Sequence, residues 1–373
     1  MKIEIVEVKS KKTLNAFVEV PWNVYKNHDN WVPPLRMAVK ELFSTKHPVY
    51  ETLRMRSWVA LLDNKPIGRI SAIINQKHND FHQESVGFFG FFECIENFEL
   101  TNALFKKAYY YFAKNKVEIV RGPVNPSSNY ELGCLVDSFD DSPRIMMTYN
   151  PSYYADFFEK LGFKKAKDLL ALNIDLSFEM PEVIKKIAAR AEKSKKVSYR
   201  SVRKKDWKQE IQTLHDIYNN AWEKNWGFVP MTKDEFLHTA KDLKTIIDEQ
   251  LITIVEVDGE AAGFILALPD MNQVFAKIPN GKLLPFGIFK LLNSKKHINR
   301  CRVITLGVKT KFRKMGLETL LYQKQHDILK YKTNYTHTEM SWILEDNQNM
   351  IKPLLKMGAD VYKTYRIYER SFR

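Results

Sequence analysis

The chain of 373 residues is 45% hydrophobic and 13% aromatic, which supplies sizeable apolar cores, and its length predicts two domains. Lys and Arg number 58 against 44 for Asp and Glu, and the net charge of +14 favours anionic partners such as CoA phosphates, nucleic acid or acidic lipid headgroups. A Lys-rich bias of the source proteome is the alternative. The charges are dispersed along the chain, which argues against DNA as a partner.

Metal and disulfide chemistry find no support in the sequence. The three cysteines, Cys94, Cys134 and Cys301, lack paired spacing, and the nine histidines are scattered, so we expect no metal site. The start of the chain carries acidic residues in an alternating pattern unlike a signal peptide, and no uncharged run of about 20 apolar residues occurs. We expect a cytoplasmic protein, with peripheral contact at the inner face of the membrane left open.

The first half of the chain alternates strand-like and helical patterns. Its predicted elements are a strand at 2–8, a helix at 13–25, a hairpin of strands at 57–62 and 67–74, a continuous apolar central strand at 86–94, a helix at 100–111, a strand at 118–122, a loop at 123–133, a helix at 149–161 and a strand ending near residue 176.

The second half repeats this plan after a basic helix or linker at 181–196. Its predicted elements are a strand at 197–202, helices at 206–224 and 232–248, a hairpin of strands at 252–257 and 260–268, an excursion at 271–300, a strand at 302–308, a helix after Arg313, a strand at 335–343, a helix at 347–357 and a last strand ending at residue 369. The pattern Asp63-x-x-x-x-Gly68-x-Ile70 recurs 195 residues later, and Leu161-Gly-Phe163 matches Met357-Gly-Ala359 at an offset of 196. Two landmarks at nearly one offset indicate a duplicated unit.

A basic turn, Arg313-Lys-Met-Gly316, links the strand at 302–308 to the helix that follows. Unpaired N–H groups and the positive end of the helix dipole meet at such a turn, which predicts an anion site suited to a diphosphate. We assign cofactor binding to Arg313, Lys314, Met315, Gly316 and Leu317. An ordinary helix N-terminus with a basic flank is the alternative reading of the same residues.

This strand, turn and helix resemble the acyl-CoA-binding motif of the GNAT acyltransferase superfamily, in which an apolar strand precedes Arg/Gln-x-x-Gly-x-Gly/Ala. Arg313 and Gly316 match the first and fourth positions, whereas Glu318 replaces the small residue at the sixth. The resemblance implies that backbone groups of Leu306 and Val308 contact the donor, and we add Asn347 to the cofactor-binding set.

The resemblance covers both halves and implies an α/β (α+β) fold of two GNAT-like domains, each a mixed, mostly antiparallel sheet flanked by helices. We expect an N-terminal domain at 1–178, a linker helix at 179–196 and a C-terminal domain at 197–373 that holds the acyl-CoA site. Acidic residues replace the basic turn after the strand at 86–94, so we expect the N-terminal domain to be degenerate.

Candidates for proton transfer lie on the strand at 335–343, where alternation places His337 and Glu339 on one face. Either residue is a candidate general base, and a solvated or structurally paired polar residue is the alternative for each. The tyrosine acid of the GNAT superfamily usually lies four residues before the late glycine, and Leu354 occupies that position here. The thiolate therefore leaves unassisted or through Tyr362 or Tyr365, of which we select Tyr365.

Two loops supply candidates for the acceptor site, although structural turns would explain both. Trp226 and Phe228 lie between two predicted helices of the second half, and Asn125 and Ser127 lie in the loop at 123–133. The excursion at 281–296 is apolar and flanked by lysines. It favours an interfacial or lipid-channel segment, with a packed lid as the alternative.

The Trp-Gly-Phe-Val-Pro loop at 226–230, the Gly-Pro-x-Asn-Pro-Ser loop at 122–127 and the terminal strand at 362–369 are similar to those of bacterial ceramide synthases. The resemblance implies an N-acyltransferase that moves an acyl group from acetyl-CoA or a long-chain acyl-CoA to a small-molecule or lipid amine such as a long-chain base. One alternative is an aminoacyl-tRNA-dependent transferase of the Fem-like type, with tRNA as partner. Another is a non-catalytic GNAT scaffold that binds an anionic partner.

Overall fold

The computed structural model describes residues 3–293 and 297–372, which form two compact units. Unit 1 contains residues 3–169, 274–293 and 363–372, and unit 2 contains residues 170–273 and 297–362. Lys2 of the first predicted strand, and Ser294, Lys295 and Lys296 of the predicted excursion, lie outside the described residues.

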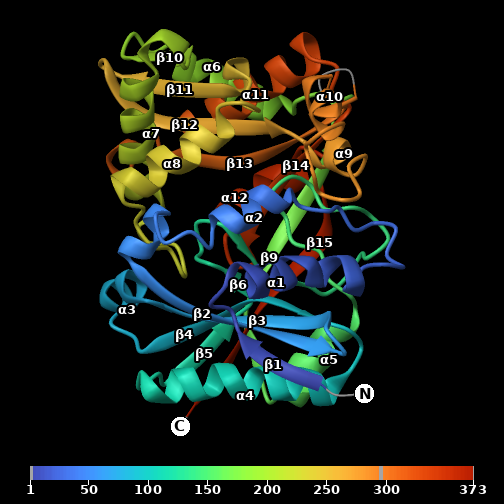
Figure 1. Ribbon diagram of the computed structural model, residues 1–373. Helices are drawn as coiled ribbons and strands as arrows, with labels where there is room; N and C mark the ends of the chain where they lie inside the picture. Colours follow the sequence, from blue (N-terminus) through green and yellow to red (C-terminus); the bar gives the residue numbers. More distant parts are fainter. Residues whose placement is uncertain (1–2, 294–296, 373) are drawn as a thin grey trace. The chain divides into compact units, whose positions relative to one another are not determined.

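Unit 1 is built from the first half of the chain and two later segments (Figure 1). Its strands are β1 (Ile3–Glu7), β2 (Leu53–Leu62), β3 (Lys65–Asn75), β4 (Val86–Cys94), β5 (Ile119–Gly122), β6 (Val124–Asn125), β7 (Glu131–Leu132), β8 (Cys134–Leu135), the first part of β9 (Lys164–Asp175) and most of β15 (Asp360–Ser371). Its helices are α1 (Lys11–Val24), α2 (Arg36–Glu41), α3 (Gln76–His82), α4 (Phe98–Lys114), α5 (Tyr153–Lys160) and α10 (Gly287–Leu292), with a 3₁₀ turn at Pro48–Glu51. The main sheet runs β1-β2-β3-β4-β5-β15, and only β4 and β5 are parallel.

The core of unit 1 is aromatic and lies between the sheet and helices α4 and α5. The rings of Phe89 and Phe105 are 5.1 Å apart, and those of Phe92 and Phe158 are 5.4 Å apart. These distances suit edge-on and tilted aromatic pairs. Helix α1 covers the opposite face, where Phe17 is fully buried. The continuous apolar strand at 86–94 is therefore central because both of its faces are covered.

Unit 2 contains the remaining elements. Its strands are the second part of β9, β10 (Val197–Ser201), β11 (Ile252–Val257), β12 (Glu260–Pro269), β13 (Arg300–Val308) and β14 (His337–Leu344). Its helices are α6 (Glu182–Glu192), α7 (Trp207–Trp222), α8 (Lys233–Leu243), α11 (Leu317–Lys332) and α12 (Gln348–Lys356), with 3₁₀ turns at Lys204–Asp206, Glu249–Leu251 and Thr310–Phe312. Helix α9 (Asn272–Phe275) connects unit 2 to the next segment of unit 1. The sheet runs β14-β13-β12-β11-β10, with only β13 and β14 parallel. Helices α6 and α11 share one apolar core with β11, β12 and β13. Helix α7 packs on the other face of the sheet, and α8 packs against α7 (Figure 1).

The predicted internal repeat is visible in the two hairpins. Asp63–Asn64 and Asp258–Gly259 all adopt positive φ, as the tight turn of a two-residue hairpin loop requires. Each hairpin also contains a bulge, between Ala60 and Leu61 in β2 and between Val255 and Glu256 in β11, again 195 residues apart. A turn and a bulge at one offset agree with a duplicated unit.

Each unit includes segments from the half of the chain that mainly forms the other unit. Strand β15, at the C-terminal end, pairs with β5 in unit 1, from Tyr368 opposite Gly122 to Ser371 opposite Ile119. Residues 274–293 of the second half also belong to unit 1. The predicted limits at 178 and 197 assigned each segment to its own half. As limits of independently folding domains, 1–178, 179–196 and 197–373 stay a prediction.

Two predicted helices are shorter than expected. The helix predicted at 149–161 begins at Tyr153, because the Asn150 side chain accepts from the Leu135 N–H at 2.7 Å and donates to its carbonyl at 3.1 Å, which holds the preceding segment outside the helix. The helix predicted at 232–248 ends at Leu243. The predicted fold class is confirmed, because both units carry a mixed, mostly antiparallel sheet flanked by helices. Across residues 3–293 and 297–372, no helix is long and apolar enough to cross a membrane.

Candidate active site

The pairing of β13 with β14 ends part-way along β13 in unit 2. The recorded parallel pairing runs only from Arg300 opposite His337 to Val303 opposite Met340, whereas β13 continues to Val308. Since the Lys309 N–H bonds to β12, alternation turns the N–H and C=O groups of Leu306 and Val308 to the other side. The two predicted donor-contacting residues therefore face the side on which β14 has stopped pairing.

The predicted anion turn follows directly. Lys314 and Gly316 adopt positive φ, at 71° and 76°, on either side of Met315. Residues with positive φ next to residues with negative φ can turn neighbouring N–H groups to the same side of the chain. Such a backbone segment can bind an anion. Gly316 is the N-cap of α11, so the N–H groups of the first helical turn from Leu317 add to it. A Cβ on Gly316 would also lie 3.1 Å from Ile187 Cγ2, a second reason for glycine there.

Helix α7 fixes this turn against the end of β13. Trp222 packs so closely over Gly307 that a Cβ there would lie 2.3 Å from its ring. The Asn220 side chain accepts from the Thr310 N–H at 2.9 Å, and Arg313 donates to the Ala221 carbonyl at 2.8 Å. The strand end and the basic turn are thus held by one helix.

The charges around the turn are partly balanced. Glu260 on β12 pairs with Lys311 at 2.6 Å and with Lys309 at 3.3 Å, and the hydrogen bond from Lys311 is the main reason that the pKa of Glu260 is lowered. Glu318 lies one helical turn before Tyr322, whose pKa is raised by burial and secondarily by this carboxylate. Arg313 and Lys314 are left as the cations on the turn itself.

A buried cluster around Glu339 lies where the β13–β14 pairing ends. The side chain of Glu339 accepts from Ser341 Oγ at 2.5 Å and from the Tyr362 hydroxyl. Arg302, directly opposite Glu339 in the register, places its Nε 3.6 Å from Glu339 Oε1 and donates to Ser341 Oγ at 2.8 Å. Glu339 is 1% exposed and Arg302 is 3% exposed, so a carboxylate and a guanidinium share one desolvated site, which the half-buried Tyr362 adjoins.

The other predicted proton-transfer residues lie elsewhere. His337, at the start of β14, is partly exposed and lies 3.5 Å from Asp175 Oδ2, and no recorded contact in the described chain joins it to Glu339. Tyr365 is fully buried in unit 1, where its register partner is Leu135 of β8. Tyr362 donates to Glu339.

The loop between α7 and α8 is internally braced. Asn219 of α7 accepts from the Met231 N–H at 3.1 Å and donates to its carbonyl at 3.2 Å. Phe228 is buried with its ring 5.7 Å from that of Tyr218, and Trp226 is half-buried. The predicted acceptor residues Trp226 and Phe228 therefore lie on a loop anchored to the helix that holds the anion turn.

Asn125 and Ser127 lie in unit 1, at the corresponding separation of β4 and β5. There the loop fills the strand end: a Cβ on Gly90 would lie 1.8 Å from the Val124 carbonyl, and Asn125 Oδ1 accepts from the Phe91 N–H at 2.5 Å. Buried Ser127 accepts from loop residues through its hydroxyl and its carbonyl. Both side chains thus stabilise the loop that covers the end of β4.

A second buried polar cluster closes the end of β4. Glu93 accepts from the hydroxyls of Tyr25 at 2.7 Å and Tyr154 at 2.8 Å and lies 3.6 Å from Arg69. Burial raises the pKa of Glu93, while Arg69 and the two tyrosines oppose that shift. In unit 1 the Glu93 cluster and the loop at 123–133 lie at the end of β4. The corresponding position in unit 2 is the end of β13.

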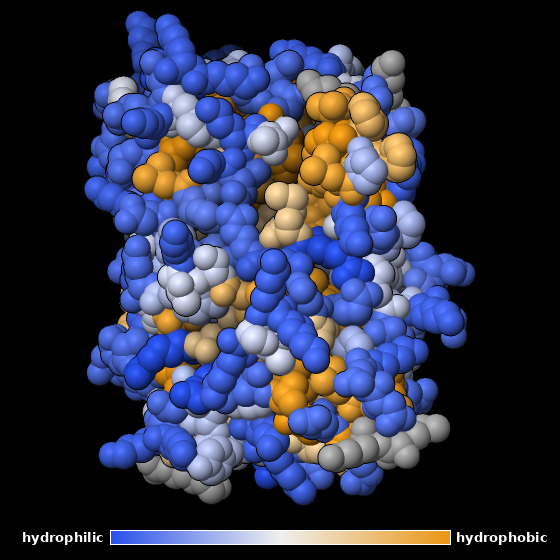
Figure 2. All heavy atoms as spheres, viewed as in Figure 1, coloured by the Kyte–Doolittle hydropathy of each residue, from blue (hydrophilic) through white to orange (hydrophobic). Residues whose placement is uncertain are grey.

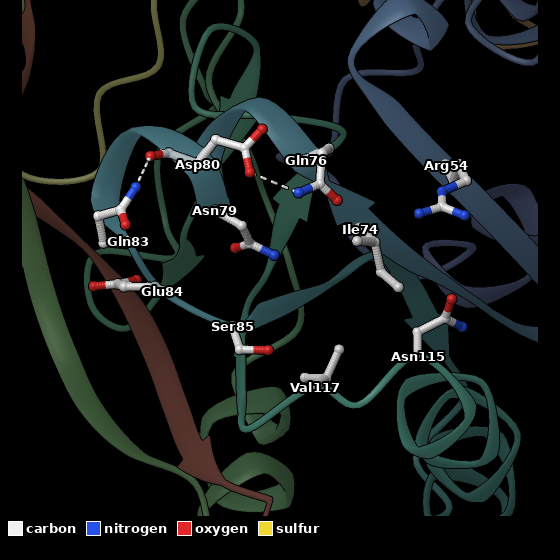
Figure 3. A pocket seen from close by; sticks show the side chains of 10 residues that line it. All are labelled: Arg54, Ile74, Gln76, Asn79, Asp80, Gln83, Glu84, Ser85, Asn115 and Val117. Atoms are coloured by element: carbon white, nitrogen blue, oxygen red, sulfur yellow. Dashed lines mark hydrogen bonds between the residues drawn. The ribbon is translucent and has the colours of Figure 1, made fainter.

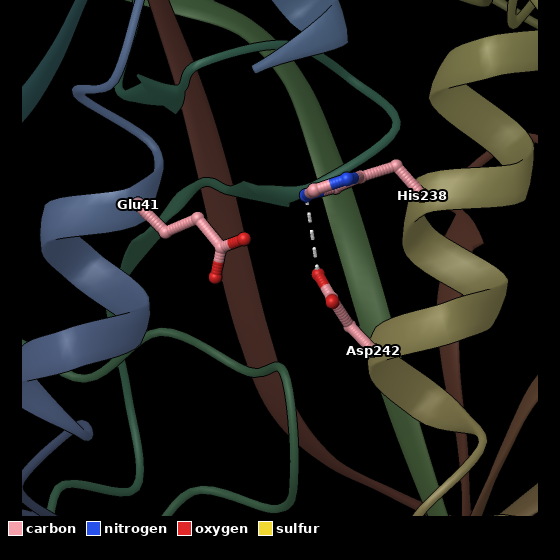
Figure 4. Close-up of side chains that lie close together, drawn as sticks. All are labelled: Glu41, His238 and Asp242. Atoms are coloured by element: carbon pink, nitrogen blue, oxygen red, sulfur yellow. Dashed lines mark ion pairs between the residues drawn. The ribbon is translucent and has the colours of Figure 1, made fainter. Parts of the chain in front are cut away.

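Two polar sites outside these strand ends are not parts of the predicted site. A cavity of about 330 Å³ in unit 1 is lined largely by polar side chains already bonded to the protein, such as Asn79, which bonds twice to Val86 (Figure 3). On α8, His238 and Asp242 form an ion pair at 3.6 Å (Figure 4). These two side chains of unit 2 are fewer ligands than a zinc site uses.

The cysteines offer no nucleophile. All three are buried, and burial raises the pKa of Cys94 and Cys301 to about 12 and that of Cys134 further. A thiol in such surroundings stays protonated and unreactive.

The chain was compared with known proteins, and no protein-family model matches it. It is 34% identical over 371 residues to Protein YghO of Escherichia coli (strain K12), covering 97% of this chain and 94% of that protein. It is also 34% identical over 377 residues to the Bacterial ceramide synthase of Caulobacter vibrioides (strain NA1000 / CB15N), covering 99% of this chain and 97% of that protein. The chain belongs to the bacterial ceramide synthase family.

The fold of this ceramide synthase family member matches solved GNAT structures. A tandem GNAT protein from the clavulanic acid biosynthesis pathway, solved without AcCoA, aligns with a TM-score of 0.60 at 10% identity over 100% of this chain and 99% of that one. A probable N-acyltransferase from Enterococcus faecalis V583 aligns at 0.55 and 11% identity over 100% of this chain and 73% of that one. The predicted tandem GNAT fold is confirmed.

Sequence reasoning did not select three residues that the structure places at the strand end of this family member: Arg302, Trp222 and Tyr362. A signal was present for Arg302, because a cation within the apolar run Cys301-Arg-Val-Ile304 needs a buried anion, and Glu339 is an acid within a similar strand. Tyr362 was considered as an acid but not selected. Trp222 gave no signal, since its role depends on the approach of α7 to Gly307.

Proposed function

We propose that the protein is an acyl-CoA-dependent N-acyltransferase that transfers an acyl group, preferentially long-chain, to an amine acceptor such as a long-chain base. The observation that carries this proposal is the open end of β13 followed by a turn with positive φ at Lys314 and Gly316. The acceptor class is suggested by the name of the relative that is 34% identical over the whole chain.

The residues of this turn fit a CoA diphosphate. The positive φ of Lys314 and Gly316 and the start of α11 at Leu317 suit an anion site of backbone N–H groups, and Arg313 and Lys314 add positive charge. Leu306 and Val308 offer peptide groups along the open edge of β13 for the pantetheine arm. Asn347 stands at the start of α12 and makes no side-chain capping bond, which leaves its amide group for a ligand.

The acyl-CoA supplies the acyl group as a thioester, so that the C–S bond breaks, a C–N bond forms, and the amine proton ends on the thiol. Glu339 and Tyr362 are the groups that we assign to this proton. Tyr362 is the more exposed of the two and donates to the carboxylate, and Arg302 Nε lies 3.6 Å from Glu339 Oε1. We propose that Tyr362 contacts the acceptor amine and that Glu339 acts through it.

Unit 1 is proposed to bind no CoA. Its loop carbonyl at Val124 lies over Gly90, and the segment after β4 carries Glu96 and Glu99 where unit 2 has its basic turn. A diphosphate would meet like charge and a covered strand end there.

The donor site is tested by thermal unfolding with CoA, acetyl-CoA and palmitoyl-CoA, on the wild type and on Arg313→Glu. A ligand at about 100 times its Kd stabilises the folded protein by roughly 2.7 kcal/mol, which a melting curve resolves. We expect the largest shift with palmitoyl-CoA and its loss in Arg313→Glu. The matched control is Lys208→Glu, an equal charge change on an exposed residue at the start of α7, which should keep the shift.

The outcomes separate the alternatives. Equal shifts with all three ligands would retain the CoA site and refute a long-chain donor. No shift with any of them would refute the donor site and favour a tRNA-dependent enzyme or a scaffold, which salt-sensitive tRNA binding would distinguish. With a positive result, mass spectrometry after incubation with palmitoyl-CoA and sphinganine should detect the amide, with one free thiol per amide.

A further inference from the structure

The segment 274–293 has an inner part that is firmly anchored to unit 1. Val274 and Ile278 are buried. The Pro279 carbonyl accepts from Trp22 Nε1 at 2.7 Å, and the Asn280 carbonyl accepts from Arg36 Nε at 2.7 Å. These contacts fix the base of the segment to α1 and α2.

The outer part of the same segment exposes large apolar side chains. Leu284, Phe286, Phe289 and Leu292 are 75%, 76%, 60% and 73% exposed, and Figure 2 shows an apolar patch over this region. Phe289 and Leu292 lie three residues apart on α10 and share one side of the helix, and Phe286 is its N-cap residue. A patch of this kind on an anchored base indicates an interaction surface.

The charge of the segment is of one sign. Residues 274–293 contain Lys277, Lys282 and Lys290 and no acidic residue, and no Asp or Glu occurs from 271 to 317. Lys282 and Lys290 are exposed beside the aromatic side chains. An apolar face bordered by lysines complements the interface of an anionic bilayer, where chains enter the acyl boundary and lysines meet the headgroups.

The geometry points to α10 and the preceding turn, residues 282–292, as a membrane-docking surface whose occupant is a bilayer that contains anionic phospholipids. Helix α10 has six residues and is about 9 Å long, which is far too short to span a bilayer, so only its apolar side can enter the interface. A second copy of the chain is a poorer occupant, because two-fold pairing of the patch would bring lysines of the same charge together. This inference does not depend on acyl transfer.

Vesicle flotation without any acyl-CoA tests this surface. Vesicles of phosphatidylcholine alone are compared with vesicles of about three parts phosphatidylcholine to one part phosphatidylglycerol, at low and at high salt. We expect the wild type to float only with the anionic vesicles, and Phe286→Asp/Phe289→Asp to remain unbound. The matched control is Tyr110→Asp on α4, which changes a side chain 64% exposed in the same unit.

Charge and folding controls complete the test. Lys282→Ala and Lys290→Ala should each weaken binding to anionic vesicles about fivefold. Circular dichroism melts should show that every variant is folded. The inference is overturned if the wild type does not float, if Tyr110→Asp loses binding equally, or if the double variant binds as the wild type does. A concentration-dependent dimer lost in the double variant, without vesicle binding, would assign the patch to a second copy.

Discussion

Replacing Glu339 with Gln should destabilise unit 2 strongly, because it leaves the buried Arg302 cation without its anion. Gln keeps the shape of the side chain and can still accept from Ser341 and Tyr362, so the variant isolates the charge. At 3.6 Å and an effective dielectric constant of about 20, the attraction is roughly 4 to 5 kcal/mol. Breaking a buried ion pair by removing one partner costs about 3 to 5 kcal/mol, and we expect a loss in that range.

Urea unfolding followed by circular dichroism measures this loss, with the midpoint and slope compared between variants. The double variant Arg302→Met/Glu339→Gln removes both charges and should recover most of the lost stability. Glu182→Gln is the control, since it removes a carboxylate from an exposed ion pair of the same unit and should leave the midpoint unchanged. A loss below about 1 kcal/mol for Glu339→Gln, or a double variant no more stable than the single one, would refute the reasoning.

Two further predictions concern pH and packing. Burial lowers the pKa of His78 to about 4, whereas the same side chain in the unfolded chain is protonated near pH 6.5. The free energy of unfolding should therefore keep its full value above pH 6.5 and fall by up to about 3 kcal/mol toward pH 4. Urea unfolding at about pH 5 and about pH 7.5 should show a smaller slope in His78→Phe than in the wild type, since buried His326, whose pKa burial also lowers, still contributes; an equal slope would contradict the prediction. Gly307→Ala should lower the free energy of unfolding by about 1 to 3 kcal/mol, because the added methyl group displaces Trp222. The same change should weaken the stabilisation of the protein by palmitoyl-CoA. Trp222→Leu should relieve much of that cost, and additive effects in the double variant would count against the contact.

The anion turn was predictable because it is local. The order of apolar strand, Arg313, Gly316 and helix is read from adjacent residues, and the positive φ that glycine tolerates is a property of single positions. The hairpins were predictable for the same reason, since Asp63–Asn64 and Asp258–Gly259 carry turn chemistry within two residues. Glu339 was selected from strand alternation alone, and the role of that residue in catalysis stays a prediction.

The sequence signals that Arg302 needs a buried anion, but it does not show that Arg302 and Tyr362 meet at Glu339. Arg302 lies 37 residues before Glu339 in the chain and Tyr362 lies 23 residues after it, and only the parallel register of β13 with β14 brings Arg302 directly opposite. Tyr362 and Tyr365 look alike in the sequence, but the division of β15 between the units places Tyr362 on Glu339 and Tyr365 in the core of unit 1.

The sequence by itself determined the tandem GNAT architecture, the basic turn and the apolar, lysine-bordered excursion, because periodicity, turn chemistry and charge are carried by neighbouring residues. Tertiary structure decided that β15 pairs with β5 in unit 1, which residues surround the buried Glu339 side chain, and that the aromatic side chains of α10 and its N-cap are exposed. These depend on contacts between residues far apart in the chain, whose free energy is set by register and burial.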